Sequence, residues 1–530
     1  MVKSAEVVIA GGGPVGLGLA IELGQRGVRT LVVERHAAPQ LVPKGQNLTQ
    51  RTMEHFHFWG AEAALRAART IPPSFAIGGI TAYGTLLSGL HYDWLQRELV
   101  RPYYYTDNER LPQYATEQVL RDRVAELDTV ELLTGWSAED VAQDADGVTL
   151  TAVARATGER RDFTADYLVG CDGSRSIVRQ HAGIRQTLSD HDRLMVLLVF
   201  RSLELDQLLQ RFPGKSYYNV LHPDFEGYWQ FFGRVDLDST FFFHAPVPET
   251  ARDGGFDFAA FLQRAVGAAF DIDLRYTGFW ELRFAIADDY RASRVFVAGD
   301  AAHSHPPYGG YGINTGFEDA RNLGWKLAAV LRGWGGPTLL DSYSAERHAV
   351  FASTARDFIA KAIEIDRDFL NRFDPARDSA AFDTEWRIRA GSARSEVRAF
   401  EPNYRGSSVV FGADGATSGA VGAHEFRAAA GRHLAPLKLS SGSSSYDLLG
   451  PGFTLFAFDV ADNVSIAFAN AAALLGLPLT IVADTWNCDA ARYEARLVLV
   501  RPDQFVAWTS NAVDEDDAGA ILRRAAGLSA

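Results

Sequence analysis

The sequence predicts an α/β protein built on a Rossmann-type parallel sheet, and two observations predict it. A chain of 530 residues, 47% hydrophobic and 22% charged, is typical of a globular protein with several domains. Three apolar runs each end in a glycine-containing loop that leads toward a helix-like stretch; they lie in residues 6–16, 164–179 and 295–316. Because the carboxyl ends of parallel strands share one edge of a sheet, the three loops are expected to converge on one extended ligand.

The composition limits the kinds of partner that the protein is expected to bind. A net charge of −14 argues against a nucleic acid or an anionic membrane surface, because both are bound by clusters of basic residues. Two cysteines, Cys171 and Cys488, are too few for a disulfide framework or a zinc site, and we expect no metal. No apolar run approaches the roughly 20 residues that cross a bilayer. We therefore expect a cytoplasmic protein with no membrane partner.

The first loop, "GGGPVG", has the GxGxxG spacing of a dinucleotide site between a strand and a helix. Gly11 permits the tight turn, Gly13 lets the backbone approach a pyrophosphate, and Gly16 lets the helix pack on the strand. The next strand ends at Glu34, whose carboxylate suits the ribose of FAD or NAD. The residues assigned to this site are Gly11, Gly13, Pro14, Gly16, Glu34 and Arg35.

The other two loops are less specific when taken singly. The second run ends in Asp172-Gly173, a dipeptide that is also typical of an ordinary turn. The third ends in Gly299-Asp300 and continues through a turn rich in glycine and proline to a helix expected to begin near Gly316.

Together these stretches resemble a known family. "GGGPVG", "CDGSRSIVR" and "GDAAHSHPPYGGYGINTGFEDARNLGWKLA" are similar to the three flavin motifs of the single-component FAD-dependent aromatic hydroxylases, the family of para-hydroxybenzoate hydroxylase and phenol hydroxylase. "SSYDLLGPGFTLF" and "LVLVRPDQFVAW" resemble the C-terminal domain of its longer members. The resemblance covers nearly the whole chain and implies FAD as the cofactor.

The resemblance also implies roles for individual residues. Asp300 would bind the ribityl chain, Asp172 would serve both FAD and nicotinamide binding, and the loop from Pro307 to Asn314 would face the flavin ring. Lys44 stands where relatives usually carry Arg and lacks the planar fork of that residue. The cofactor residues added in this way are Lys44, Gln113, Asp172, Asp300, Pro307, Gly310, Gly312, Ile313 and Asn314.

The implied activity is that of a monooxygenase. No second GxGxxG follows a strand, so NADH or NADPH is expected to bind only transiently. In the family, the nicotinamide reduces the flavin, O₂ adds to give a C4a-hydroperoxyflavin, and one oxygen passes to a phenolic or other aromatic ring. Two alternatives stay open: a Baeyer-Villiger-type oxygen insertion or another oxidation on a polyketide-like substrate, and a flavin-binding protein without catalysis.

Residues 186–289 contain alternating aromatic side chains that resemble the substrate domain of the family, an antiparallel sheet above the flavin. The same alternation is also typical of an ordinary core. The polar candidates for contact with the substrate are Tyr217, Tyr218, His222, Arg234, His244, His303, His305, Tyr308 and Tyr311, of which His303 is expected to be structural. The candidates chosen for catalysis are Tyr217, Arg234, His305 and Tyr308.

The expected domains follow. The FAD-binding domain takes residues 1–75, 108–185 and 290–345, and the substrate domain takes residues 76–107 and 186–289. Residues 345–410 form a helical connector. Residues 415–530 form a C-terminal domain that is thioredoxin-like in long relatives; without CxxC we expect it to serve packing or the contacts of a homo-oligomer.

Overall fold

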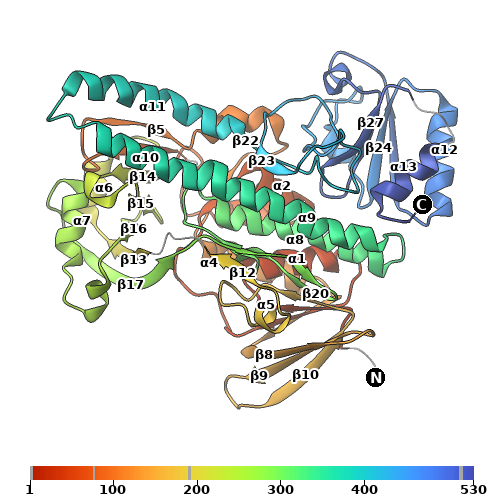
Figure 1. The fold of residues 1–530 in the computed structure, drawn as a ribbon, viewed down its shortest axis with the longest axis horizontal. Helices are drawn as coiled ribbons and strands as arrows, with labels where there is room; N and C mark the ends of the chain where they lie inside the picture. Colours follow the sequence, from red (N-terminus) through yellow and green to blue (C-terminus); the bar gives the residue numbers. More distant parts are fainter. Residues whose placement is uncertain (1–3, 76–77, 189–192, 513–516, 530) are drawn as a thin grey trace.

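The computed structural model describes the chain except for residues 1–3, 76–77, 189–192, 513–516 and 530. It is a mixed α/β fold with two large sheets, a set of long helices that runs across both of them, and a smaller sheet at the C-terminal end (Figure 1). Among the described residues, no helix has the length and apolar character that a membrane span requires.

The first large sheet has the strand order β19-β20-β11-β1-β2-β7. Its parallel strands are β1 (Val7–Ala10), β2 (Thr30–Glu34), β7 (Val130–Thr134), β11 (Tyr167–Gly170) and β20 (Val295–Val297), and β19 (Arg291–Ala292) pairs antiparallel at the edge. All four residues of β1 are buried, as expected of a central parallel strand. Because β20, β11 and β1 are neighbours, the three loops predicted from the sequence leave the sheet side by side.

Helices and a small sheet cover the two faces of this sheet. Helix α1 (Pro14–Gly24) packs against α8 (Tyr311–Leu331) and α4 (Gln113–Ala125) on one face. The other face packs on an antiparallel sheet of β8 (Trp136–Gln143), β9 (Val148–Ala154) and β10 (Arg160–Ala165), and the short α5 (Ile177–His181) lies beside it.

The second large sheet has the order β17-β13-β16-β15-β14-β4-β5. Its strands are β4 (Gly79–Tyr83), β5 (His91–Trp94), β13 (Arg193–Arg201), β14 (Tyr217–Leu221), β15 (Trp229–Arg234), β16 (Thr240–Pro246) and β17 (Asp273–Leu282). The expected antiparallel pairing holds for all of them except β4 and β14, which run parallel. Helices α6 (Leu203–Leu209) and α7 (Phe258–Val266) cover its outer face, while its inner face turns toward the start of α8.

A helical segment follows α8. It comprises α9 (Pro337–Ser353), a π-helical turn η5 (Thr354–Ala360), α10 (Lys361–Arg372) and α11 (Ser379–Ala399), and ends in β22 (Phe400–Asn403). α9 begins inside the range expected for the FAD-binding domain, with Pro337 at the first helical position, where its missing N–H is harmless. Helix α11 folds back along α10 (Figure 1), and Phe369 and Trp386 pack between them.

The C-terminal sheet has the order β25-β24-β26-β27, with β24 (Phe453–Phe458), β25 (Leu479–Asp484), β26 (Leu497–Val500) and β27 (Val506–Ser510). Helices α12 (Asp462–Leu474) and α13 (Ala518–Ala525) share a core with this sheet. Trp325 of α8 and Trp334 belong to the same core, so the C-terminal sheet packs directly on the helices of the first sheet. Cys488 is exposed on this part of the molecule.

A buried cluster of charged side chains joins the C-terminal part of the chain to α8 and α9. Arg501 Nη1 lies 2.7 Å from Glu346 Oε1 on α9, and Arg501 Nη2 lies 2.6 Å from Asp503 Oδ2. Lys326 Nζ on α8 lies 2.7 Å from Glu346 Oε2. All four side chains are fully buried, so each charge depends on its partners.

We predict that Arg501→Met strongly destabilises the protein. The substitution leaves Glu346 and Asp503 buried with one cation fewer, a change that costs about 3–5 kcal/mol. Thermal unfolding of the variant should show a clearly lower midpoint than the parent protein. Arg523→Met, on the exposed face of α13, is the control, and an equal shift in both variants would contradict the assignment.

Candidate functional site

The first glycine loop is shaped by three different requirements. Gly11 has a φ of +104°, and a Cβ there would lie 2.3 Å from the carbonyl oxygen of Cys171. A Cβ on Gly16 would lie 2.0 Å from the carbonyl oxygen of Gly11. A Cβ on Gly13 would meet no protein atom within 4 Å. The first two glycines are therefore required by the packing of the protein itself, whereas Gly13 leaves open the side from which a ligand can approach.

The start of α1 offers hydrogen-bond donors. Its N-cap, Gly13, has no side-chain cap, and Pro14 occupies the first turn. Glu34 closes the loop from the side, because its Oε2 accepts the backbone N–H of Gly12 at 2.7 Å and its Oε1 accepts that of His36 at 2.7 Å. Each carboxylate oxygen can accept a further donor, such as a ribose hydroxyl. Arg35 is exposed and directs its Nε to the ring of His36 at 3.1 Å.

Asp172 ends the second loop. Its Oδ2 accepts the backbone N–H groups of Ile177 at 2.8 Å and Val178 at 3.2 Å, while its buried Oδ1 has no partner among the described residues. Burial raises the pKa of this carboxyl. An unsatisfied buried acceptor is costly, so Oδ1 suits a hydroxyl or amide donor from a ligand. The neighbouring Cys171 is half-buried, and burial raises the pKa of its thiol.

Asp300 follows β20 in the third loop. Its side chain is reachable by solvent yet surrounded by protein, and this desolvation raises its pKa against the opposing charges of His303 and Lys44. Within the described part of the chain its carboxylate makes no hydrogen bond. It is therefore available to hydroxyl donors such as those of a ribityl chain.

Asp319 of α8 holds the third loop in place through hydrogen bonds. It is fully buried and accepts the backbone N–H of Gly299 at 2.9 Å, His303 Nε2 at 2.6 Å and Arg347 Nε at 2.7 Å. Burial acts to raise the pKa of Asp319, but His303 and Arg347 hold it below its ordinary value. His303 is thus engaged with Asp319 and also stacks on Phe351, with ring centroids 4.1 Å apart, as a structural residue would be.

The turn before α8 has two consecutive glycines in left-handed geometry, Gly309 with φ +66° and Gly310 with φ +70°. α8 begins at Tyr311, five residues before the start near Gly316 that the sequence indicated. Its N-cap, Gly310, has no side-chain cap, and its first turn carries no acidic residue. The positive end of a 21-residue helix therefore faces outward over this turn, where it favours an anion.

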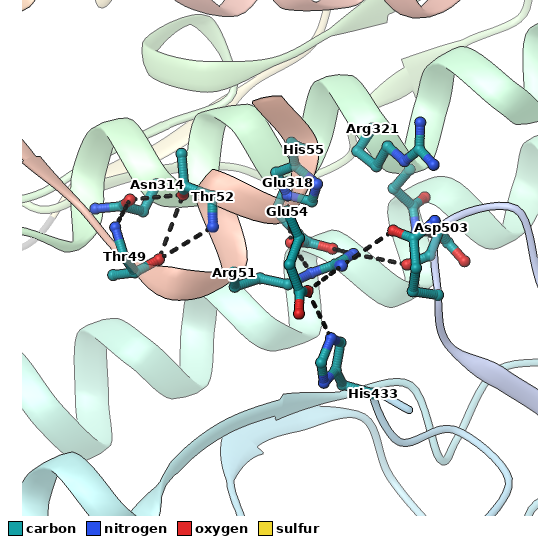
Figure 2. Close-up of polar contacts among 12 residues, drawn as sticks. Thr49, Arg51, Thr52, Glu54, His55, Asn314, Glu318, Arg321, His433 and Asp503 are labelled. Carbon is teal, nitrogen blue, oxygen red and sulfur yellow. Dashed lines mark hydrogen bonds and ion pairs between the residues drawn. The ribbon is translucent and has the colours of Figure 1, made fainter. Parts of the chain in front are cut away.

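Asn314 fixes the first turn of α8. Its Nδ2 donates to the carbonyl oxygens of Asn47 at 2.8 Å and Gly310 at 2.6 Å. Its Oδ1 accepts the backbone N–H of Thr49 at 2.9 Å and the hydroxyl of Thr52 at 2.6 Å (Figure 2). The amide of Asn314 is therefore committed to protein partners and positions the turn.

Other predicted cofactor residues meet at the same place. Gln113 Oε1, at the start of α4, accepts the backbone N–H of Gly45 at 3.3 Å. Ile313 lies against Gly45, where an added Cβ would come within 3.3 Å of it. Lys44 is exposed beside them. One surface next to Asp300 is thus formed by Lys44 and its neighbours, the start of α4 and the start of α8.

Two residues near this surface were not predicted from the sequence. Both side-chain amide atoms of Asn47 are buried without a partner, and Asn47 lies directly against Gly310. Arg110 is buried, has no carboxylate within 4.0 Å among the described residues, and places its Cζ 4.5 Å from the centroid of the Tyr217 ring. No local motif marks either residue, since each becomes conspicuous only through partners that are distant in sequence.

Adjacent tyrosines on β14 show which face of the second sheet points inward. Tyr217 packs with Trp229 and Tyr308 on the inner face, and among the described residues its hydroxyl has no partner at hydrogen-bond geometry. Tyr218 lies on the outer face, where its hydroxyl accepts Arg234 Nε at 3.1 Å. Arg234 also pairs with Asp206 of α6. The expectation that Arg234 acts in the site is therefore corrected, because strand alternation places it on the face away from the glycine turn.

Tyr308 and His305 lie at the turn itself. The Tyr308 ring lies 5.2 Å from Trp229 and 5.9 Å from Trp94, between the turn and the inner face. His305 Nδ1 donates to the Pro306 carbonyl at 2.6 Å, which leaves the buried Nε2 as an acceptor without a partner. Burial lowers the pKa of His305 to about 4, so its ring is neutral at pH 7.

The remaining candidates divide between structural and inner-face positions. His222 accepts the backbone N–H of Asp224 at 3.2 Å and caps a short turn. Tyr311 donates its hydroxyl to Glu396 Oε1 at 3.0 Å. His244 is buried on the inner face, where burial lowers its pKa to about 4 and its Nδ1 has no partner.

These features define a flavin-binding α/β protein, and comparison with known proteins specifies the family. Residues 4–357 match the family model of an FAD-binding domain, and residues 427–528 match the model described as aromatic-ring hydroxylase, C-terminal. The chain therefore belongs to the FAD-binding aromatic-ring hydroxylases, as the sequence motifs suggested. It is an FAD-dependent monooxygenase of aromatic substrates.

Individual relatives align over nearly their whole lengths. The chain is 32% identical to 4-methyl-5-nitrocatechol 5-monooxygenase from Burkholderia sp, over 97% of this chain and 96% of the relative. It is 33% identical to a putative polyketide hydroxylase from Streptomyces halstedii, over 96% and 94%. The rebeccamycin biosynthetic enzyme RebC with reduced flavin superimposes with a TM-score of 0.84 at 30% identity, over 99% of both chains. Aklavinone-11 hydroxylase with FAD and aklavinone gives 0.80 at 25% identity, over 99% and 100%.

We predict that two alanine substitutions in the first loop fail in different ways. Gly13→Ala meets no protein atom and should leave the thermal midpoint of the FAD-free protein unchanged, while its methyl group lowers FAD affinity at least tenfold by blocking the approach of the pyrophosphate. Gly16→Ala collides with the Gly11 carbonyl and should lower that midpoint. Flavin fluorescence and thermal unfolding measure both effects. Equal behaviour of the two variants would refute the division of roles.

Proposed function

We propose that the protein uses NADH or NADPH and O₂ to hydroxylate a phenolic ring, and that its substrate is a polycyclic, polyketide-like aromatic compound. Support for the ring class comes from the relatives, which include a nitrocatechol monooxygenase and a putative polyketide hydroxylase. Support for substrate size comes from the solved complex with aklavinone.

FAD is proposed to lie along the three loops. The ADP half of FAD would be surrounded by residues of the first loop and of the end of β2, namely Gly11, Gly13, Pro14, Gly16, Glu34 and Arg35. The carboxylates of Asp172 and Asp300 would accept hydroxyl donors of the cofactor. The surface next to the flavin ring would be formed by Lys44, Gln113, Pro307, Gly310, Gly312, Ile313 and Asn314. The bound flavin supplies the redox and oxygen-transfer chemistry. The uncapped start of α8 supplies a positive end that stabilises negative charge on a reduced flavin.

The observation that carries the substrate proposal is a set of unsatisfied polar atoms on an aromatic wall. On the inner face of the second sheet, three buried polar atoms have no partner in the part of the chain that the structure describes: Tyr217 Oη, His244 Nδ1 and Trp280 Nε1. His244 and Trp280 lie together, with ring centroids 5.9 Å apart. Buried polar atoms are normally satisfied, so these three suit the hydroxyl and carbonyl groups of an oxygenated aromatic substrate.

Arg110 is proposed to favour the reactive phenolate. An ordinary phenol has a pKa near about 10. A buried guanidinium without a carboxylate partner, placed against Tyr217, would lower the pKa of a phenol bound at this wall. The phenolate is the more electron-rich ring and the better acceptor of an electrophilic oxygen.

The C-terminal sheet is proposed to be thioredoxin-like in fold, which its four strands and two packed helices support. It has no CxxC for dithiol exchange. Its extensive contact with α8 supports a packing role. Light scattering of the purified protein would show whether it also joins subunits in a homo-oligomer.

The test is turnover by the FAD-loaded protein with NADH or NADPH, O₂ and a panel of simple phenols, polycyclic phenols and polycyclic ketones. The expected result is nicotinamide oxidation stimulated by a polycyclic phenol and a product heavier by one oxygen atom. A ring-expanded lactone from a ketone would favour the Baeyer-Villiger alternative. FAD reduction that no aromatic compound stimulates, with no oxygenated product, would refute catalysis on this class.

We predict that Tyr217→Phe and Tyr218→Phe separate substrate binding from stability. Tyr217→Phe removes a hydroxyl with no protein partner, so it should raise the KM for the substrate about 2- to 10-fold without lowering the thermal midpoint. Tyr218→Phe removes a hydroxyl bonded to Lys215 O at 2.7 Å and to Arg234, so it should lower the midpoint and leave KM unchanged. The reverse pattern would exclude Tyr217 from the substrate wall.

A further inference from the structure

A cavity of about 70 Å³ lies between the helices of the first sheet and the C-terminal part of the chain. One side is formed by the start of α2 (Gln50–Phe58) and the first turn of α8, and the other includes Phe400, His433 and Phe505. Figure 2 shows Glu54 of α2 in contact with both Arg51, on the same helix, and His433 across this boundary. Neither Tyr217 nor Trp229 lines the cavity, so it is separate from the aromatic wall proposed for the substrate.

The cavity contains a buried cation that forms no ion pair with the described residues. Arg97, in the 3₁₀-helix η1 (Arg97–Tyr103), is only 5% exposed. The other lining arginines are paired, Arg51 with Glu318 at 3.0 Å and Arg347 with Asp319 at 2.7 Å. Across the residues the structure describes, Arg97 has no carboxylate within 4.0 Å and its Nε has no acceptor. Buried guanidinium groups are normally paired, so this one lacks an anion.

The acidic groups around the cavity do not supply that anion. Glu318 is held by Arg51 and by His55 Nε2 at 2.9 Å. Glu401 Oε1 lies 3.1 Å from Arg432 Nε. Glu396 accepts the hydroxyl of Tyr311 at 3.0 Å, and burial raises its pKa against the opposing effects of Tyr311 and of the charge on Arg97. Within the described part of the chain, none of these three carboxyl groups therefore forms an ion pair with Arg97.

Aromatic side chains form much of the remaining wall. They are Tyr103, Tyr104, Tyr311, Phe400 and Phe505. The Arg97 guanidinium lies 5.7 Å from the centroid of the Tyr311 ring, so the cation and the aromatic surface adjoin. We propose that this cavity binds a small aromatic carboxylate, with the carboxylate on Arg97 and the ring against the tyrosine and phenylalanine side chains.

Arg97 would connect such a ligand to the turn of residues 307–310 before α8, which is proposed to face the flavin and is called the flavin turn below. Arg97 Nη2 donates to the carbonyl oxygen of Gly309 at 3.2 Å, and Gly309 directly precedes the N-cap of α8. Asn314 and Thr315 of the first turn of α8 line the same cavity. A ligand that engages Arg97 therefore alters the flavin turn, and by reciprocity FAD binding alters the affinity of the cavity for its ligand.

The test is titration of the FAD-loaded protein with benzoate in a calorimeter, without NADH or NADPH. The expected result is one benzoate per chain, with benzyl alcohol, the uncharged analogue, at least tenfold weaker. Arg97→Met should weaken benzoate at least tenfold. Arg394→Met, which removes an exposed arginine of the neighbouring helix α11, is the matched control and should leave the affinity unchanged.

Absence of benzoate binding, equal binding of benzyl alcohol, or unchanged affinity in Arg97→Met would each overturn the proposal. So would a loss of affinity in Tyr217→Phe with full affinity in Arg97→Met, because benzoate would then occupy the substrate wall. If Arg97→Met does not fold, Arg97→Lys keeps the charge and loses the planar fork, and its affinity should still fall at least threefold. No turnover occurs in this measurement, so its outcome and that of the hydroxylation test are independent.

Discussion

The position of α8 depends on the buried carboxylate of Asp319. One oxygen of this side chain holds the Gly299 N–H and the His303 ring of the third loop, and the other holds Arg347 of α9. A single residue thus joins the loop after β20 with α8 and α9. The spacing between Asp300 and the start of α8, on which the proposed flavin surface depends, follows from this one set of contacts.

α8 is buried over most of its length, yet several of its buried side chains are charged. Glu318 pairs with Arg51 of α2, Arg321 with Glu22 of α1, and Lys326 with Glu346 of α9. Apolar side chains of similar volume would avoid the cost of desolvating these charges. Together these ion pairs fix the rotation and the axial position of the helix, and therefore the direction of its uncapped first turn.

The sequence motifs predicted the three loops and the cofactor class because glycine geometry is a local requirement. Gly11 needs a positive φ and Gly16 needs close contact wherever the rest of the chain lies. The start of α8 was misplaced because Gly312 and Gly316 are poor helix formers, and the packing of Gly316 against Val15 outweighs that local preference. Arg234 was misassigned because the alternation of side chains along a strand shows which residues share a face, but not which face points inward. Arg234 shares the outer face with Tyr218. Arg110 and Arg97 could not be found, since an unpaired buried charge is defined only by distant neighbours.

The two cysteines differ in burial and therefore in their reactivity toward a thiol-specific label. The Cys171 thiol lies beneath the first glycine loop, and burial raises its pKa, so little reactive thiolate forms at neutral pH. Cys488 is exposed on the C-terminal part. A maleimide dye or spin label would thus attach at one position of the native protein without mutagenesis. Because flavin is itself a fluorophore and a paramagnet when half-reduced, that single label would report the separation between the C-terminal part and the flavin.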